Sequence, residues 1–449
     1  MSVSIEDFGA KETADNNAVA IQKAIDSLTN GGTVEIPAGT WVSGTLQLKP
    51  NVRLHLDHGA VLKGSPRMAD YPDTGLYHNE LGKVKGLIYA KDAENITIDG
   101  DGLIDYNGLG FFDFTRPNNP VLDYSNYSDD QKKQFAVKFT ERPTSMMFLQ
   151  HCPGLNIKDV HVKDAASWDI VLTACDHVKI VNLTISSNQR IPNDDGIHLC
   201  GCRDVVIANC DLQTGDDCIA ITNITDWERE TRNITVTNCV LSSSSTGIRI
   251  GYWRSKIDHV QISNCTISDS SRGVLINANN AGYVRNVMIN QLSYVGRPHA
   301  GAWWGNGEAI YVNAVPYKLD SQTDHQFDQA DVFPNVQNVR VTHLNAISNI
   351  GIVMVGDKKN IQDFTIADAD ITMINSVNRD VLGDDISLSP IQRDIKVPEG
   401  AEYWLYAEEV KDSQVTGVKV HNRLQQPLTQ VEQKVVKCDH LRVDATYCD

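Results

Sequence analysis

A short motif recurs at nearly constant spacing through the middle of the chain. Each copy is a run of alternating β-branched residues that ends at Asn, and the closing residues are Asn182, Asn209, Asn238, Asn264 and Asn290, spaced by 27, 29, 26 and 26 positions. Alternation of this kind predicts a β-strand, and Asn favours the turn after it. A strand that returns at such intervals predicts a solenoid, in which every repeat packs only against its neighbours.

The length of the repeat selects among repetitive folds. A β-propeller blade needs about 40 to 45 residues, and leucine-rich repeats need Leu at fixed positions. Leu is scarce in these segments, whereas Val, Ile and Cys are frequent. Short parallel strands that bury such side chains predict an all-β fold, the right-handed parallel β-helix, with about three or four strands per coil. We expect a single domain of this kind over residues 1–449.

Segments outside the repeats predict how the solenoid begins and where it carries loops. Residues 15–28 have amphipathic spacing after Asp15 or Asn16 and stop at Gly31-Gly32, which predicts an N-terminal capping helix in a cap region of residues 1–50. The coils are expected over 51–425 and a tail over 426–449, with loop insertions near 105–145 and 295–335. Long insertions on a solenoid commonly shape a binding groove.

The chain is acidic, since 57 Asp and Glu residues against 40 Lys and Arg give a formal net charge of −17. This balance argues against nucleic acid as a partner, because phosphate binding requires clustered cations. No run of 18 apolar residues is present, so no membrane contact through a spanning helix is expected. The first residues lack the basic and apolar regions of a signal peptide, so we expect a cytoplasmic protein unless an export signal has been removed.

The ten cysteines are informative through their positions. Cys210, Cys239 and Cys265 each follow a repeat Asn, which indicates stacked core thiols rather than disulfides or metal ligands. Cys438 and Cys448 are the pair that we expect to bridge under oxidising conditions. No Cys or His spacing is typical of zinc, so neither a metal nor another cofactor is expected.

The strand that follows each Asn-ended strand places chemically active residues in two columns. The residue just before this strand is Trp168, Asp195, Asp217, Thr246, Arg272 or Glu308 in successive copies. An outward position within the strand is His198, Ala220, Arg249, Leu275 or Tyr311. Because parallel strands lie about 4.8 Å apart, Asp195 and Asp217 are expected within one rung of each other. Paired carboxylates that flank a glycosidic bond are the usual machinery for its hydrolysis.

Three ordered motifs then resemble a known family. Asn193-Asp194-Asp195, Gly215-Asp216-Asp217 and Gly247-Ile-Arg-Ile-Gly251, together with the N-terminal Asp7-Phe8-Gly9-Ala10, are similar to glycoside hydrolase family 28, the polygalacturonases and related pectinases, over residues 5–425. The resemblance implies an inverting hydrolase in which Asp216 is the general acid. It also implies that Asp195 and Asp217 hold and deprotonate the attacking water.

The chain departs from the family pattern at two motifs. The family's Gly-His-Gly, whose His orients the acid, falls on Ser245-Thr246-Gly247, so Thr246 stands at the position of that His. The family's Arg-Ile-Lys, which grips the galacturonate carboxylate, falls on Leu275-Ile276-Asn277, so both of its cations are absent. Arg249 or Arg272 could replace the lost cations, or the substrate could be a neutral sugar. The candidate substrate-binding residues are Asn193, His198, Trp168, Thr246, Arg249, Arg272, Glu308 and Tyr311.

These features favour hydrolysis of O-glycosidic bonds in pectin-related or other plant polysaccharide fragments. Two alternatives stay open at this point, a carbohydrate-binding or adhesive β-helix without turnover and a polysaccharide lyase. The long insertions favour a closed end of the groove and hence exo action on an oligosaccharide or polysaccharide. The sequence carries no prediction of the oligomeric state.

Overall fold

The computed structural model describes residues 1–118, 127–224, 229–279, 282–301, 303–316, 334–382, 385–387 and 394–448. The chain divides into two compact units, and the single domain expected from the sequence stays a prediction. The first unit comprises Met1–Leu122, Ala136–Ile219 and Ile234–Val240. The second comprises Asp123–Phe135, Ala220–Asn233 and Leu241–Asp449.

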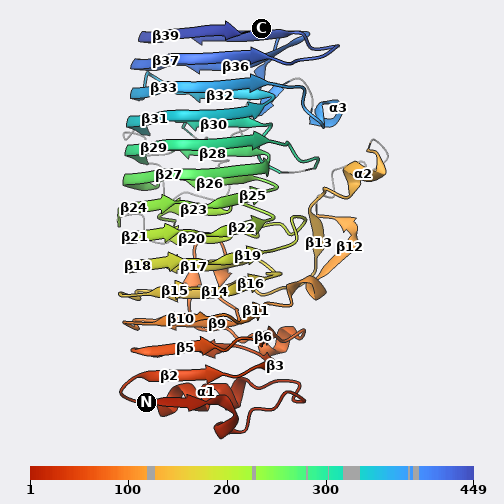
Figure 1. The fold of residues 1–449 in the computed structure, drawn as a ribbon, viewed down its shortest axis with the longest axis vertical. Coiled ribbons are helices and arrows are strands. Elements are labelled where there is room, and N and C mark those ends of the chain that lie inside the picture. The colour runs from red at the N-terminus through yellow and green to blue at the C-terminus, as the bar shows by residue number, and fades with distance from the viewer. Residues whose placement is uncertain are drawn as a thin grey trace. The chain divides into compact units, whose positions relative to one another are not determined.

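Parallel strands form three rows in the first unit, seen as stacked arrows in Figure 1. The first row is β1 (Ser2–Ser4), β2 (Gly32–Ile36), β5 (Val52–Leu56), β10 (Thr97–Gly100), β15 (Asn156–Lys158), β18 (Asp176–Val181) and β21 (Arg203–Ala208). The second row is β3 (Gly39–Ser43), β6 (Ala60–Gly64), β11 (Leu103–Asp105), β16 (His161–Lys163), β19 (Thr184–Ser186) and β22 (Asp211–Thr214). The third row is β4 (Leu46–Gln47), β9 (Ile88–Lys91), β14 (Ser145–Gln150), β17 (Trp168–Thr173) and β20 (Ile197–Cys200).

The core of this unit is a set of aliphatic columns. Leu54 of β5 pairs with Ile98 of β10, which pairs with Ile157 of β15, and the column continues through Ile180 to Ile207. All five side chains are buried. A shift of one residue in any strand would turn its apolar side chains outward, so burial of these columns sets the register of every coil.

Three of the five repeated Asn residues turn the chain directly after a strand, as the sequence predicts, whereas Asn264 and Asn290 lie inside the longer strands Lys256–Ser270 and Tyr283–Gly296. Asn182, Asn209 and Asn238 adopt left-handed backbone conformations with φ between 56° and 57°. Asn tolerates this region better than other residues with a side chain. Their side chains also form a ladder, because Nδ2 of Asn209 donates to Oδ1 of Asn182 at 3.3 Å and Nδ2 of Asn238 donates to Oδ1 of Asn209 at 3.2 Å.

In the third row of the first unit, β14, β17 and β20 are buried on both faces. A hairpin of β7 (Tyr77–His78) and β8 (Gly82–Lys83) covers its outward side. Leu76 and Val84 of this segment pack on Phe148, Trp168 and Val171, which project from β14 and β17. Trp168, a candidate substrate-binding residue in the sequence, is packed under this hairpin and only 4% exposed.

The second unit has two rows of parallel strands, and the strands of one row are longer than those of the first unit. One row is β27 (Lys256–Ser270), β29 (Tyr283–Gly296), β31 (Asn335–Ser348), β33 (Ile361–Met373), β37 (Val410–Asn422) and β39 (Asp439–Cys448). The other row is β26 (Thr246–Ile250), β28 (Arg272–Asn277), β30 (Glu308–Asn313), β32 (Ile350–Val355), β36 (Ala401–Glu408) and β38 (Gln430–Val436). Three strands, β23 (Ile219–Thr222), β24 (Thr231–Thr237) and β25 (Val240–Ser243), contain residues of both units.

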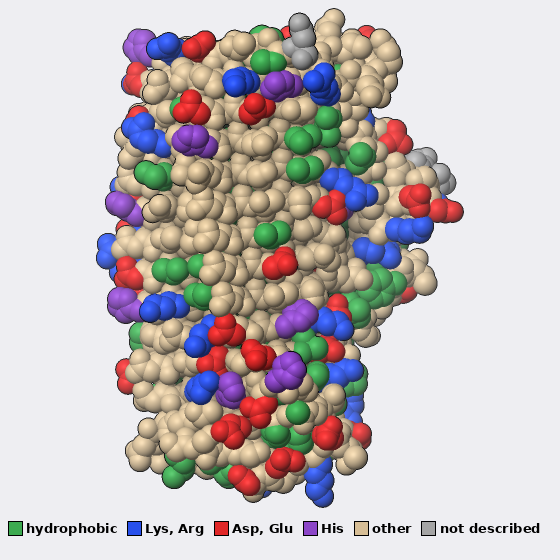
Figure 2. Space-filling view, viewed as in Figure 1, with side chains coloured by type: hydrophobic (Ala, Val, Ile, Leu, Met, Phe, Trp, Pro, Cys, Tyr) green, Lys and Arg blue, Asp and Glu red, His purple; other side chains and the backbone are tan. Residues whose placement is uncertain are grey.

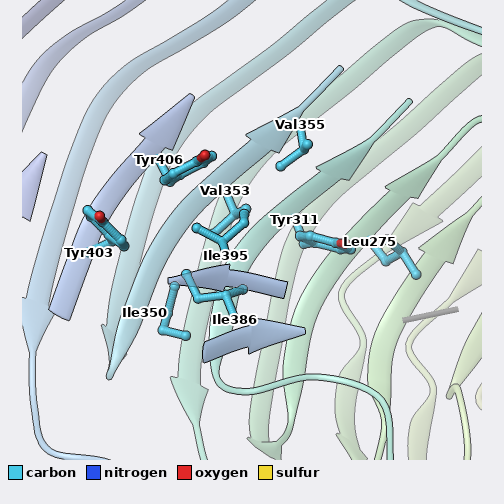
Figure 3. Packing of buried hydrophobic residues seen from close by; sticks show 9 residues of the cluster. All are labelled: Leu275, Tyr311, Ile350, Val353, Val355, Ile386, Ile395, Tyr403 and Tyr406. Carbon is cyan, nitrogen blue, oxygen red and sulfur yellow. The ribbon is translucent and has the colours of Figure 1, made fainter. Parts of the chain in front are cut away.

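The outward side of β28, β30 and β32 is also covered by a hairpin. Figure 3 shows β34 (Asp385–Ser387) and β35 (Asp394–Lys396) as short antiparallel strands across this side. Ile386 and Ile395 of the hairpin pack in one buried cluster with Leu275, Tyr311 and Val353. Leu275 and Tyr311, expected on an open face, therefore lie in an apolar core.

The two chain ends refine the sequence expectations. The N-terminal helix is α1 (Ala18–Ser27), shorter than expected, and neither Asp15 nor Asn16 is its N-cap residue, which is Asn17. The segment expected as a C-terminal tail contributes β38 and β39, which pair with β36 and β37. Cys438 and Cys448 are free thiols, and the three stacked core thiols are buried as predicted.

The first predicted insertion forms a hairpin of β12 (Phe112–Pro117) and β13 (Val137–Phe139), but residues 119–126 lie outside the described residues. The second predicted insertion includes residues 302 and 317–333, which also lie outside them. The remaining helices are η1 (Ile5–Phe8), η2 (Met68–Asp70), η3 (Gly108–Phe111), α2 (Asp129–Lys132) and α3 (Arg379–Leu382). None of the helices in the described ranges is long and apolar enough to cross a membrane.

Several outward positions of the first-row strands carry charged side chains, for example Glu35, Arg53 and Lys158. Figure 2 shows acidic, basic and His side chains gathered over the strands nearest the N-terminus. One shallow hollow there contains Arg53, His55 and Asp99, and Nε of Arg53 lies 2.9 Å from Oδ1 of Asp99. This surface follows the alternation of the strands, in which every second side chain faces water.

Candidate active site

The two aspartate motifs form neighbouring turns in the first unit. Gly196 donates its backbone N–H to the carbonyl of Asp217 at 3.0 Å, and Asp216 donates to the carbonyl of Asp194 at 3.3 Å. Gly215 lies so close to the preceding coil that a β-carbon there would be 2.1 Å from the carbonyl oxygen of Ile191. These contacts lock the two turns together and bring Asp195, Asp216 and Asp217 to adjacent rungs.

The three aspartates differ in exposure. Asp195 and Asp217 are each 2% exposed, whereas Asp216 is half-buried. The carboxyl of Asp216 accepts a hydrogen bond from the backbone N–H of Asp217 at 3.0 Å, and its carbonyl accepts one from the hydroxyl of Thr214. Asp216 is thus the one of the three whose side chain reaches solvent while its backbone is held by the turn.

His198 lies against the carboxyl group of Asp195. Its Nδ1 lies 3.0 Å from Oδ2 of Asp195, and its side chain is fully buried. The imidazole stacks on Trp168 with ring centroids 4.0 Å apart, and His78 meets Trp168 edge-on at 5.2 Å. Burial, with the neighbouring His198, lowers the pKa of His78 to about 3, so His78 is neutral. In this arrangement His198 contacts both Trp168 and Asp195, and neither ring is open to solvent.

A second carboxyl pair, Asp169 and Asp194, lies in the interior beside the turns. Both residues have no exposed surface, and their carboxyl groups interact with each other. Within the described part of the chain, neither oxygen of Asp169 nor Oδ1 of Asp194 meets a donor, while Oδ2 of Asp194 accepts from the N–H of Gly215 at 2.9 Å. Burial raises the pKa of both carboxyls well above the usual range. A shared proton supplies the missing donor.

Arg142 lies beside the first aspartate turn, at Pro192 and Asn193. Its Nη1 donates to the carbonyls of Ala166 at 2.8 Å and Pro192 at 2.6 Å, and its Nη2 donates to Oδ1 of Asn193 at 2.9 Å. The guanidinium carbon lies 3.9 Å from the ring centroid of Phe139. Burial lowers the pKa of Arg142 to about 10, although the charges of Asp194 and Asp216 act in the opposite direction. The side chain is therefore cationic at neutral pH.

The second unit contains the other predicted site residues. Arg272 and Glu308 are fully buried and form a two-point ion pair, with Nε to Oε2 at 3.2 Å and Nη2 to Oε1 at 3.3 Å. The Arg272 guanidinium also lies 4.1 Å from the ring centroid of Tyr311. These three side chains contact one another, which leaves none of them an exposed surface for a sugar in this conformation. Their predicted roles in substrate binding stay predictions.

Thr246 and Arg249 lie on β26 and are also enclosed. Thr246 is fully buried, and Arg249 is 5% exposed with its guanidinium 4.9 Å from the ring centroid of Tyr252. Leu275 and Asn277, which stand at the positions of the family's cations, have no exposed surface. The outward columns read from the sequence exist as strand registers, but covering segments enclose most of their members.

Sequence reasoning missed Arg142 and Asp169, and it gave no role to Asp194 within the Asn193-Asp194-Asp195 motif. Asp169 follows Trp168 at the start of β17, and an acidic residue in this mostly apolar strand is a signal that could have identified it. Arg142 lies in a predicted insertion, and no repeat phase connects it to the aspartate turns. Across the described ranges, no group of three or more His, Cys, Asp or Glu side chains is arranged to hold a metal ion.

Comparison with known sequences gives a consistent result. The model of Glycosyl hydrolases family 28 matches residues 28–296, more than half of the 449-residue chain. An exo-poly-alpha-D-galacturonosidase from Dickeya chrysanthemi is 30% identical over 251 residues, which cover 48% of this chain and 41% of that protein. A polygalacturonase from Persea americana is 26% identical over 56% of this chain and 48% of that protein. The chain thus spans less than half the length of these relatives.

Comparison with solved structures concerns the fold. A family 28 exopolygalacturonase from Yersinia enterocolitica superposes with a TM-score of 0.66 at 20% identity, covering 97% of this chain and 78% of that one. A hyperthermoactive exopolygalacturonase from Thermotoga maritima gives a TM-score of 0.64 at 21% identity, covering 83% and 87%. These likenesses confirm the predicted right-handed parallel β-helix.

Proposed function

The chain belongs to glycosyl hydrolases family 28, and on this premise we propose that it is a glycoside hydrolase that cleaves pectin-derived galacturonan from a chain end. The observation that carries the proposal is the pair of interlocked turns around Asp195, Asp216 and Asp217. Two hydrogen bonds join their backbones, so three carboxyl groups from two motifs share one small region. Glycoside hydrolysis needs such a group, because an acid must protonate the leaving oxygen while a base activates water.

The exposures of the three aspartates support the division of labour. Asp216 reaches solvent and can meet the glycosidic oxygen, which fits the general acid. Asp195 and Asp217 are nearly enclosed, and His198 restrains Asp195 at 3.0 Å. Carboxylates held in this way suit the binding and deprotonation of one water molecule, and its attack opposite the leaving group inverts the anomeric centre.

The β7–β8 hairpin supports action at a chain end. It fills the outward side of β14 and β17, and β17 is the strand that pairs with β20 directly after Asp195. His78 of the hairpin stands 6.5 Å from the ring of His198. A polysaccharide that ran along the strand stack through the site would collide with this hairpin. A short substrate, or the end of a long one, fits the space that is left.

The test compares wild-type protein with Asp216→Asn on defined oligogalacturonides. We expect the variant to lose about 10³-fold in kcat, since general acid catalysis contributes on this order. Asp211→Asn, a substitution of an exposed aspartate on β22, is the matched control and is expected to keep full activity. Chromatography of early products should show release of a single short sugar, and NMR should show inversion of the first-formed anomer.

Each alternative has its own outcome in the same experiment. Undiminished activity of Asp216→Asn would remove the acid from the mechanism. Affinity for the oligosaccharide without turnover would indicate a binding module. Products with the absorbance of an unsaturated uronate would indicate a lyase, and an early mixture of many product lengths would contradict action at a chain end.

A further inference from the structure

The galacturonate proposal leaves one chemical need unmet, a cation for the sugar carboxylate. The site is rich in carboxyl groups, and an anionic sugar beside Asp195, Asp216 and Asp217 would meet repulsion. The family positions that carry cations are Leu275 and Asn277 in this chain, and both are buried. A specific grip on galacturonate therefore requires a positive group from another segment.

Arg142 has the placement for this task. It follows the β12–β13 hairpin and reaches the turn that carries Asp194 and Asp195, where its Nη1 binds the carbonyls of Ala166 and Pro192. Its Nη2 donates to Oδ1 of Asn193 at 2.9 Å, and the charges of Asp194 and Asp216 raise the pKa of the guanidinium. The rings of Phe112 and Phe139, 5.6 Å and 3.9 Å from the guanidinium carbon, hold it against the hairpin.

The hydrogen-bond count of Arg142 leaves donors for a ligand. A guanidinium has five N–H groups. Nη1 uses both of its hydrogens on carbonyl oxygens, and Nη2 uses one on Oδ1 of Asn193. Nε–H and the second Nη2–H meet no acceptor among the residues that the structure describes, and the side chain is half-buried rather than enclosed. Nε and Nη2 form the edge with which arginine grips a carboxylate at two points.

We propose that Arg142 is a specificity-determining residue that binds the carboxylate of a galacturonate unit next to the cleaved bond. This inference rests on the proposed function, because it names how that site selects a uronate. The backbone carbonyls of Ala166 and Pro192 fix the guanidinium, so the fork is in place before substrate arrives. Such preorganisation favours the charged sugar over its uncharged analogue.

The experiment measures discrimination rather than activity alone. Wild-type protein, Arg142→Gln and Arg142→Lys are compared on trigalacturonate and on its methyl ester, which has the same linkages without the charges. We expect Arg142→Gln to lose about 100-fold in kcat/KM on the acid and less than about 3-fold on the ester, and Arg142→Lys to fall between, since it keeps the charge without the fork. Arg116→Gln, an exposed arginine on the same hairpin, is the matched control and should leave the ratio unchanged.

A binding measurement separates this idea from the catalytic proposal. In the Asp216→Asn background, calorimetry with galacturonic acid and galactose should show a preference for the acid that Arg142→Gln removes. The calorimetric test remains valid even if the wild-type protein hydrolyses neither oligosaccharide. That outcome would contradict the proposed function but not the role of Arg142. Equal losses on acid and ester, or an unchanged preference in calorimetry, would show that Arg142 only holds the 192–193 turn and would overturn the inference.

Discussion

The buried Asp169–Asp194 pair makes the stability of the fold depend on pH in a defined direction. Both carboxyls have a raised pKa because they are buried together, so the folded protein keeps a shared proton at a pH where ordinary carboxyls have lost theirs. In the unfolded chain both groups titrate near the usual value of 3.8. Between that pH and the pKa of the folded pair, the folded state binds more protons, and its stability falls as pH rises.

The size of this effect follows from one retained proton. Each pH unit within the window lowers the free energy of unfolding by about 1.4 kcal/mol. Asp169→Asn replaces the proton-sharing partner with an amide, whose N–H₂ donates to Oδ1 of Asp194 at every pH.

The assay is urea unfolding at half-unit steps between pH 4 and pH 7. We expect the free energy of unfolding of Asp169→Asn to depend less steeply on pH than that of the wild type, by up to about 1.4 kcal/mol per pH unit. Asp211→Asn, exposed on β22, controls for the loss of one carboxyl and should follow the wild-type slope. Parallel curves for Asp169→Asn and the wild type would refute the shared proton.

Three further substitutions test the packing and the turns. Trp168→Ala should lower the free energy of unfolding by about 3 to 5 kcal/mol, because the ring fills a buried cluster with Phe148, and a loss under about 1 kcal/mol in urea titration would contradict that packing. Arg272→Met should lower the free energy of unfolding by about 3 to 5 kcal/mol, because Glu308 is then buried without its partner. The double variant with Glu308→Leu should recover most of this loss in thermal unfolding. An unchanged stability of the single variant would contradict the buried ion pair. Asn209→Ala should be less stable than Asn209→Gly by about 1 kcal/mol, because φ is 56° there, and equal melting temperatures of the two variants would exclude that strain.

Much of the fold was predictable because its cause is local. The closing Asn has a left-handed backbone and follows a strand at Asn182, Asn209 and Asn238, and the inward Val, Ile and Leu positions form the buried columns. Both properties follow from residues a few positions apart, and the repeat copies them along the chain. The phase of the repeat also gave the closeness of Asp195 and Asp217, since stacked strands bring equivalent positions together.

The covering hairpins were not predictable in the same way. The β7–β8 and β34–β35 hairpins lie outside the repeat, and which strands they cover depends on contacts between segments far apart in the chain. For this reason Trp168 and Tyr311, expected at an open face, are buried. Arg142 depends on the same kind of long-range packing, because its guanidinium donates to the carbonyls of Ala166 and Pro192, which lie 24 and 50 positions further along the chain.

The sequence by itself determined the solenoid, its register and the two aspartate turns, because strand alternation and the Asn turns are local properties that a repeat multiplies. Only the tertiary structure decided which outward residues face solvent, how Asp169 and Asp194 come to share an interior site, and which arginine binds the turn at Pro192 and Asn193. Burial of a side chain and the hydrogen-bond partner that it finds both depend on segments that are distant in the sequence. Neither can be read from the residue itself or from its neighbours in the chain.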